Sequence, residues 1–213
     1  CQSLRNLTDA IEAASQSRLS AKIVLLPHGF LAANPDVTAT GQEDEEQQNP
    51  TITKFIDHFE TPPQQPRSAA RWVPFLANLV GTPDEQTYFV GHSIGCQTII
   101  RYLATIDATI GGAVFVAGFV TLTPLATREE ENRKIAEPWL TTPIDFGRAR
   151  RTSSNFVAIF SDNDEWVPPE NARAYEEQLG AKTIVEHAKG HFSGSDGVTE
   201  LPSALEALLS MTS

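Results

Sequence analysis

Short apolar runs alternate along this chain with segments in which apolar residues recur at helical spacing. The runs have the length of strands and end at turn-forming residues, whereas the other segments repeat every three or four residues. Strands that alternate with helices favour a parallel sheet covered by helices on both faces. The expected strands are residues 22–26, 55–57, 87–90, 113–116, 156–160 and 183–185.

The expected helices fill the intervals between these strands. They are residues 4–15, 71–80, 93–105, 170–179 and 202–209. Residues 127–151 are mixed and charged, so short helices anchored by Trp139 and Phe146 are expected there. The sequence therefore predicts an α/β fold with a mostly parallel central sheet.

The chain length of 213 residues fits one α/β domain, and no internal repeat or domain boundary is visible. We expect residues 1–213 to form a single domain. Residues 1–20 are predicted to be a helical extension at the N-terminus. Residues 32–53 are polar and contain the acidic cluster 43–46, which predicts a long acidic surface loop.

The net charge of the chain argues against nucleic acid as a partner. Sixteen Lys and Arg against 27 Asp and Glu give a net charge of −11, whereas proteins that bind nucleic acid need a basic surface. No apolar run is long enough to cross a bilayer. We therefore expect no nucleic-acid partner, no membrane span and a cytoplasmic location. The alternative location is a lipid anchor, if Cys1 is the first residue of a mature lipoprotein.

The two cysteines, Cys1 and Cys96, do not show metal-binding spacing. Cys96 falls on a helix that the pattern predicts to be buried, where a thiol packs as a small apolar group. We therefore expect neither a Cys1–Cys96 disulfide nor a metal site, and no cofactor is predicted.

Residues 91–95 read Gly-His-Ser-Ile-Gly and carry the strongest chemical signal. Ser93 follows a predicted strand and opens a predicted helix, as a nucleophile elbow requires. The turn is tight, so side chains at Gly91 and Gly95 would collide across it. The helix N-terminus also stabilises negative charge near Ser93. The simpler interpretation is a strand-to-helix turn in which Ser93 caps the helix.

A serine hydroxyl is a weak nucleophile and needs a base. His191 lies in the loop between the last expected strand and the last expected helix, where this architecture brings a base over the nucleophile. His187 is the rival, although it lies at the strand end, where its side chain could simply pack. His92 is too close to Ser93 along the chain for a productive contact with Oγ, and His58 is expected to be solvated.

An acid must orient the imidazole of the base. Asp162 and Asp164 both follow the strand 156–160, and both could instead be turn or helix-cap residues. Asp164 is favoured because it directly precedes the x-x-Val-Pro segment. The order Ser93, Asp164, His191 matches the Ser…Asp…His order of α/β-hydrolases.

A tetrahedral intermediate needs backbone N–H groups at its oxyanion. One donor should be Ile94, the residue after the candidate nucleophile. The second should come from the loop after the first strand, at Phe30 or, alternatively, at Leu31. Trp166, Phe192 and Phe30 are candidates for an apolar acyl wall, with core packing as the alternative role.

The sequence resembles the retinoblastoma-binding-protein-9 and YdeN-like serine hydrolases, a branch of the α/β-hydrolase superfamily. The resemblance covers about residues 55–209 and rests on residues 89–96, 117–119, 131–146, 161–168 and 190–192. It implies Ser93 as nucleophile, Asp164 as acid and His191 as base. It also implies little or no cap domain and activity on small esters or related acyl compounds.

Two departures from that family are visible. A helix precedes the first strand, and the acidic loop 32–53 stands where the family has a Trp-containing helix. Residues 79–83 lack the Leu-x-Cys-x-Glu run of the family's namesake, so the retinoblastoma protein is not a predicted partner.

The combined prediction is a serine hydrolase that cleaves small esters through an acyl-enzyme on Ser93, with a small-molecule acyl compound as its substrate. Thioesters, lactones and amides are equally compatible electrophiles. The rival hypothesis is a non-catalytic interaction module on a hydrolase scaffold. The oligomeric state stays open.

Overall fold

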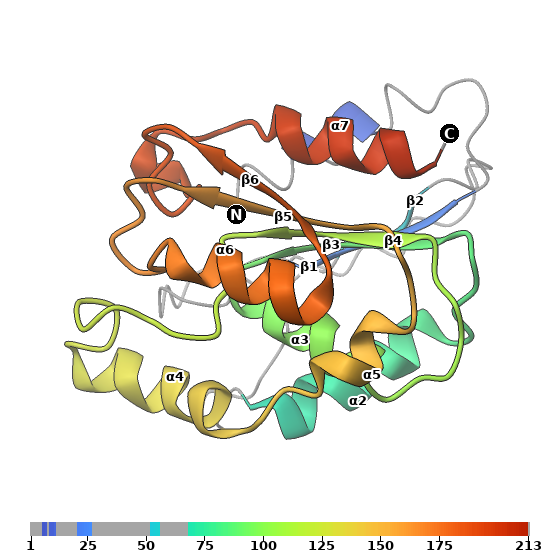
Figure 1. Cartoon of the computed structure of the whole chain (residues 1–213), viewed down its shortest axis with the longest axis horizontal. Coiled ribbons are helices and arrows are strands. Elements are labelled where there is room, and N and C mark those ends of the chain that lie inside the picture. The colour runs from blue at the N-terminus through green and yellow to red at the C-terminus, as the bar shows by residue number, and fades with distance from the viewer. Residues whose placement is uncertain (1–5, 8, 12–20, 27–51, 56–67, 213) are drawn as a thin grey trace, which may run out of the picture.

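The computed structural model describes residues 6–7, 9–11, 21–26 and 68–212, together with the backbone of residues 52–55. Its centre is a sheet of six parallel strands in the order β2-β1-β3-β4-β5-β6 (Figure 1). The strands are β1 (Lys22–Leu26), β2 (Ile52–Phe55), β3 (Thr87–His92), β4 (Gly112–Val116), β5 (Phe156–Ser161) and β6 (Lys182–Glu186). This confirms the expected α/β fold with a parallel sheet.

Helices cover both faces of the sheet. One face carries α7 (Pro202–Met211), against which the helical residues near the N-terminus also pack (Figure 1). On the opposite side lie α2 (Ala69–Val80), α3 (Ile94–Leu103), α4 (Glu130–Thr141), α5 (Phe146–Arg150) and α6 (Glu170–Ala174), which η1 (Tyr175–Leu179) prolongs. Two apolar cores, one on each face, therefore enclose the sheet.

Strand β3 shows why the central runs are continuously apolar. Phe89 points into the core beneath α3, whereas Tyr88 and Val90 point into the core beneath α7. Successive side chains alternate between the two faces, and both faces are buried. The register pairs His92 with Val116 of β4, so the ends of these strands lie side by side. Catalytic loops in such sheets follow the carboxyl ends of the strands.

The second strand begins three residues earlier than expected and ends two residues earlier. It spans 52–55 instead of 55–57, and Ile23 of β1 pairs with Ile52. β-Branched residues at 52 and 53 favour the strand, so the expected acidic loop cannot extend to residue 53. Residues 32–51 of that loop lie outside the described part of the chain.

Two of the expected helices, at the N-terminus and at residues 170–179, are confirmed only in part by the structure. The N-terminal helix is confirmed where it is described, because residues 6–7 and 9–11 are helical and Leu7 and Ile11 are buried. The expected helix 170–179 is α-helical only to Ala174, and its second half is a π-helix that ends at Gly180 in a left-handed conformation.

The segment between β4 and β5 packs on the main core. Trp139 of α4 and Phe146 of α5 are buried, as predicted. Arg101 of α3 is also buried, and its Nη2 donates to the backbone oxygens of Trp139 at 2.9 Å and Thr142 at 2.6 Å. These bonds tie α4 to the helix that starts at the elbow. Within the described ranges, no helix combines the length and apolarity that a membrane crossing needs.

Candidate active site

Ser93 occupies the turn between β3 and α3. Its φ of 53° and ψ of −115° lie in a region that residues other than glycine seldom adopt. Its backbone N–H donates to the carbonyl of Val116 at 2.9 Å, and its own carbonyl accepts from Cys96 at 3.0 Å. These bonds hold the strained turn between β4 and the first turn of α3, as in a nucleophile elbow.

The two glycines around Ser93 have a steric reason in the structure. A Cβ at Gly95 would lie 2.4 Å from the backbone oxygen of Leu26 at the end of β1. A Cβ at Gly91 would lie 2.8 Å from the backbone nitrogen of Cys96. Real Cβ atoms do not approach so closely, so both positions exclude side chains. At Gly91 the collision is within the turn, as expected from the sequence, whereas at Gly95 it is with β1.

Asp164 and His191 meet although they come from different strand-end loops. Asp164 follows β5 and His191 follows β6, and Nδ1 of the imidazole lies 2.8 Å from Oδ2 of the carboxylate. The other oxygen, Oδ1, accepts from the backbone N–H groups of Trp166 at 2.8 Å and Val167 at 3.0 Å. Since a carboxylate only accepts, Nδ1 carries the proton and Nε2 keeps a lone pair when the ring is neutral.

The electrostatic environment of His191 favours the neutral ring. Burial lowers the pKa of His191, and the hydrogen bond with Asp164 opposes this effect without overcoming it. At neutral pH the imidazole can therefore accept a proton at Nε2. The carboxylate beside it is then placed to stabilise the imidazolium that forms.

The loop that carries His191 is held by two further side chains. Asp196 accepts at Oδ2 from the backbone N–H of His191 and from that of Ser193, each at 3.0 Å. Asn163 accepts at Oδ1 from the N–H of Gly190 at 2.8 Å. Neither residue was predicted from the sequence pattern. A Ser-x-x-Asp capping box at residues 193–196 was the available signal for Asp196.

The loops of the candidate nucleophile and the candidate base also touch. The ring of His92, directly before Ser93, hydrogen-bonds through Nε2 with the backbone oxygen of His191 at 2.8 Å. The two imidazole centroids are 5.0 Å apart. The structure therefore brings the elbow, Asp164 and His191 together at the carboxyl edge of the sheet.

The rival acid and the rival base pair with each other. Nδ1 of His187 lies 2.6 Å from Oδ2 of Asp162, while Oδ1 of Asp162 accepts from the N–H of Ala188 at 2.9 Å. His187 is 90 % exposed and Asp162 45 % exposed, against 7 % for His191 and 2 % for Asp164. The two alternatives therefore form a second, solvated pair.

The proposed oxyanion donors are described in part. Ile94 begins α3, where backbone N–H groups lack partners within the helix. Phe30 and Leu31 lie outside the described residues. Leu26, which ends β1 and leads into their loop, has its backbone oxygen against Gly95. The end of β1 is therefore beside the elbow.

A cavity of about 260 Å³ opens beside His191. Its lining comes from the loops after β5 and β6: Asn163, Glu165, Trp166, Gly190, His191, Ser193, Ser195 and Asp196. The Trp166 ring lies 5.2 Å from the His191 ring at an interplanar angle of 33°. Phe192 is fully buried in the core on the α7 face, which matches the packing alternative for this residue.

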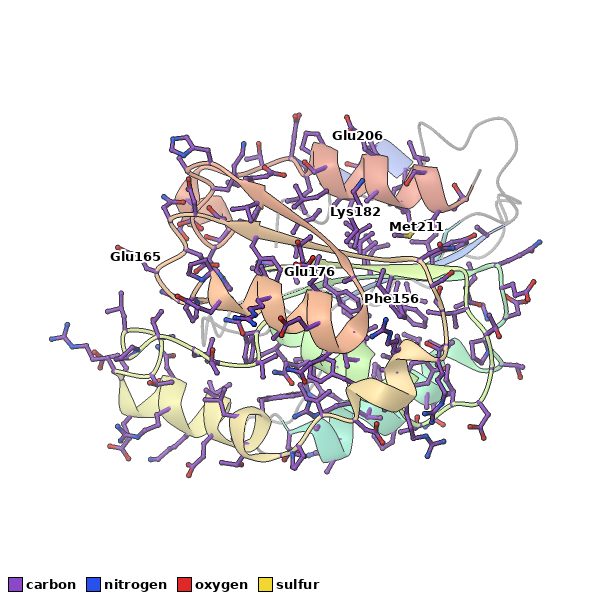
Figure 2. All side chains as sticks on the ribbon, viewed as in Figure 1. Phe156, Glu165, Glu176, Lys182, Glu206 and Met211 are labelled. Atoms are coloured by element: carbon purple, nitrogen blue, oxygen red, sulfur yellow. The ribbon has the colours of Figure 1, made fainter. Side chains whose placement is uncertain are left out.

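Figure 2 shows which end of the sheet carries this cavity. Glu165, one of the lining residues, projects from the loop after β5, whereas Phe156, where β5 begins, lies toward the opposite end. The described residues contain no group of three His, Cys, Asp or Glu side chains that could hold a metal ion.

Asn171 is a buried residue that the sequence pattern did not single out. Its Oδ1 accepts from the backbone N–H groups of Val120 at 2.6 Å and Thr121 at 3.0 Å, and its Nδ2 donates to Pro168 at 2.8 Å. It therefore fixes the loop after β4 to the loop that carries Asp164.

Comparison with known proteins agrees with this architecture. The serine hydrolase family model matches residues 24–210. YdeN of Bacillus subtilis (strain 168) is 28 % identical over 150 residues, which cover 70 % of this chain and 75 % of YdeN. The crystal structure of the B. subtilis ydeN gene product superimposes with a TM-score of 0.69 and 21 % identity, covering 90 % of this chain and 98 % of that one.

A second solved structure shares the fold at lower identity. The carboxylesterase CesB (YbfK) of Bacillus subtilis matches with a TM-score of 0.56 and 12 % identity, covering 92 % of this chain and 85 % of that one. The family match spans most of the chain and includes the elbow and both strand-end loops. The chain therefore belongs to the serine hydrolase family, as a YdeN-like enzyme of hydrolase type with the α/β-hydrolase fold.

Proposed function

We propose that this hydrolase cleaves small esters by acyl transfer through Ser93, with His191 as base and Asp164 as acid. The observation that carries the proposal is the buried Asp164–His191 hydrogen bond, made beside the strained turn of Ser93. A buried carboxylate is costly unless its oxygens are bonded. Here both oxygens accept hydrogen bonds, and one of them orients the imidazole.

The first step forms the acyl-enzyme. Oγ of Ser93 attacks the ester carbonyl carbon while its proton moves to Nε2 of His191, and the carbonyl oxygen becomes the oxyanion. The leaving alcohol then takes the proton from His191 as the carbon–oxygen bond breaks. In the second step a water molecule attacks the acyl-enzyme and gives its proton to His191, which returns it to Oγ as the acid leaves.

The oxyanion would lie at the N-terminus of α3. We assign its donors to the N–H groups of Ile94 and Phe30, because a donor after the nucleophile and one after the first strand typify this fold. The contact between Leu26 and Gly95 supports the second donor, since it brings the end of β1, which precedes Phe30 in the chain, to the elbow. One such donor contributes about 10² to 10³ in rate.

The cavity supports a small substrate. This cavity beside His191 encloses about 260 Å³, with a lining that does not include Ser93, and it is below the range of about 300–1,000 Å³ typical of drug-sized ligands. Trp166 covers the His191 ring and gives the cavity an apolar surface. We therefore assign Trp166 to the wall that an acyl or alcohol group contacts.

A fluorophosphonate probe tests the proposal because it phosphonylates an activated serine. Wild type should be labelled, with the label on the peptide that contains Ser93, and should hydrolyse p-nitrophenyl acetate. Ser93→Ala should lose both activities. Ser210→Ala is the matched control, since this exposed serine lies on α7.

Two results would contradict the proposal. The first is equal labelling of wild type and Ser93→Ala. The second is a label on Ser193 or Ser195, which line the cavity beside His191. An unlabelled but folded wild-type protein would favour the rival hypothesis of a non-catalytic interaction module.

A further inference from the structure

His92 is a buried imidazole that the proposed mechanism leaves without a role. It ends β3 and is 1 % exposed. Its Nε2 lies 2.8 Å from the backbone oxygen of His191, and its ring lies 5.0 Å from the ring of His191. Thus the residue before the candidate nucleophile contacts the backbone of the candidate base.

The direction of this hydrogen bond follows from charge and chemistry. Burial lowers the pKa of His92 to about 4, so the ring is neutral at neutral pH and has a single N–H group. A carbonyl oxygen only accepts, and therefore Nε2 must be the protonated nitrogen. His92 thus directs its one ring proton at the backbone of His191.

We propose that His92 is a positioning residue, which holds the His191 carbonyl through Nε2–H and so fixes the base relative to Ser93. The proposal rests on the function assigned above. Asp164 and Asp196 also hold His191, but they come from the loops after β5 and β6. His92 adds an anchor on the strand that carries the nucleophile.

This anchor matters because proton transfer depends on distance. Ser93 is fixed to β4 by its own N–H, whereas His191 lies in a loop beyond β6. A shift of about 1 Å between reacting groups can cost about 10²-fold in rate. The direct hydrogen bond from His92 to the His191 carbonyl keeps the separation of Ser93 and His191 constant when either loop moves.

The test compares three substitutions of His92. Gln places an amide N–H near the position of Nε2, and Met has a similar length without a donor. Asn carries an amide donor on a side chain that is too short to reach the His191 carbonyl. In His92→Met and His92→Asn, kcat for p-nitrophenyl acetate should fall about ten- to a hundredfold, with KM within about twofold. His92→Gln should recover most of the lost kcat.

A spectroscopic readout makes the test independent of turnover. The Nδ1 proton of His191, bonded to Asp164, should give a downfield NMR resonance in wild type and in His92→Gln. It should broaden or shift in His92→Met and His92→Asn. If these spectra change as expected while wild type hydrolyses no ester, the proposed function fails and the positioning role stands.

Four outcomes would overturn the positioning role. The first is an unchanged His191 resonance in both His92→Met and His92→Asn. The second is a kcat, per folded molecule, within twofold of wild type in His92→Met. The third is a Gln variant no better than the Met variant. The fourth is a lower melting temperature in all three variants without a change in kcat, which would show a structural role alone.

Discussion

Two Asp–His pairs connect the same two loops, and they differ in burial more than in chemistry. Asp164 and His191 lie 2.8 Å apart and are almost fully enclosed. Asp162 and His187 lie 2.6 Å apart, and water reaches both side chains. The shorter bond belongs to the exposed pair. Hydrogen-bond length therefore does not distinguish the proposed catalytic pair. Burial does, because water competes with the exposed hydrogen bond and not with the buried one.

The exposed pair has a different use of its own. Asp162 accepts from the backbone N–H of Ala188, and its own N–H donates to the carbonyl of Glu186. Both bonds join the end of β5 to the start of the loop that leads to His191. We interpret the exposed pair as a brace for that loop. In the proposed mechanism, the buried pair instead orients the imidazole so that Nε2 of His191 can accept a proton.

The largest expected contrast is between the two aspartates. In Asp164→Asn, kcat/KM for p-nitrophenyl acetate should fall by about 10⁴, because an amide no longer fixes the tautomer of His191. Asp162→Asn should stay within about fivefold of wild type, since water screens the exposed pair and leaves it little energetic weight. Steady-state kinetics on variants checked for folding by circular dichroism decide this. A larger loss in Asp162→Asn would reverse the assignment of the acid.

The pH dependence of kcat/KM should also distinguish the two Asp–His pairs, with an effect smaller than the loss of activity expected in Asp164→Asn. His191 must be neutral to act as base, and burial lowers its pKa. Activity should therefore persist below the ordinary histidine value of about 6.5 and be lost as the pH falls through the lowered pKa. Asp164→Asn removes a group that raises this pKa, so the midpoint of its residual activity should be lower still. His187→Gln should leave the midpoint in place, and a midpoint that moves with it would contradict the comparison.

The smallest expected effect concerns the stability of the exposed pair. The N–H of Ala188 and the His187 side chain lower the pKa of Asp162 in the folded state. Its stabilising effect is therefore complete above the unfolded value of about 3.9 and is lost as the pH falls through the lower folded value. Melting curves should place Asp162→Asn slightly below wild type at pH 7, with a gap that closes toward pH 3. A gap that widens there would rule out this role for the pair.

Much of the fold was predictable because its central strands are buried on both faces. The runs at residues 87–90, 113–116 and 156–160 have no competing interpretation, and each forms a strand. The second strand was placed wrongly because Ile52–Phe55 contains Thr53 and Lys54, which read as part of a polar loop. Pairing with β1 decides this strand, and such pairing is not visible in a local window.

The site was predictable at Ser93 and at the choice of loops, because each candidate follows its own strand. The sequence favoured Asp164 over Asp162 by its place before the x-x-Val-Pro segment, and the structure adds that Asp164 is the more buried of the two. His92 was predictable as a residue of the elbow but not as a contact of His191. That contact joins residues 99 positions apart, and no spacing rule in the sequence reports it.

Strand β6 has a consequence for how this enzyme would lose activity. It lies at the end of the strand order and pairs with β5, and its residues Lys182 and Val185 are exposed. The loop with His191 therefore extends from a peripheral strand, whereas Ser93 follows an inner one. Peripheral segments open locally at a lower free energy than the whole fold. Inactivation by mild heat or denaturant should thus begin by detachment of the His191 loop while Ser93 stays in an intact sheet, and it should be reversible.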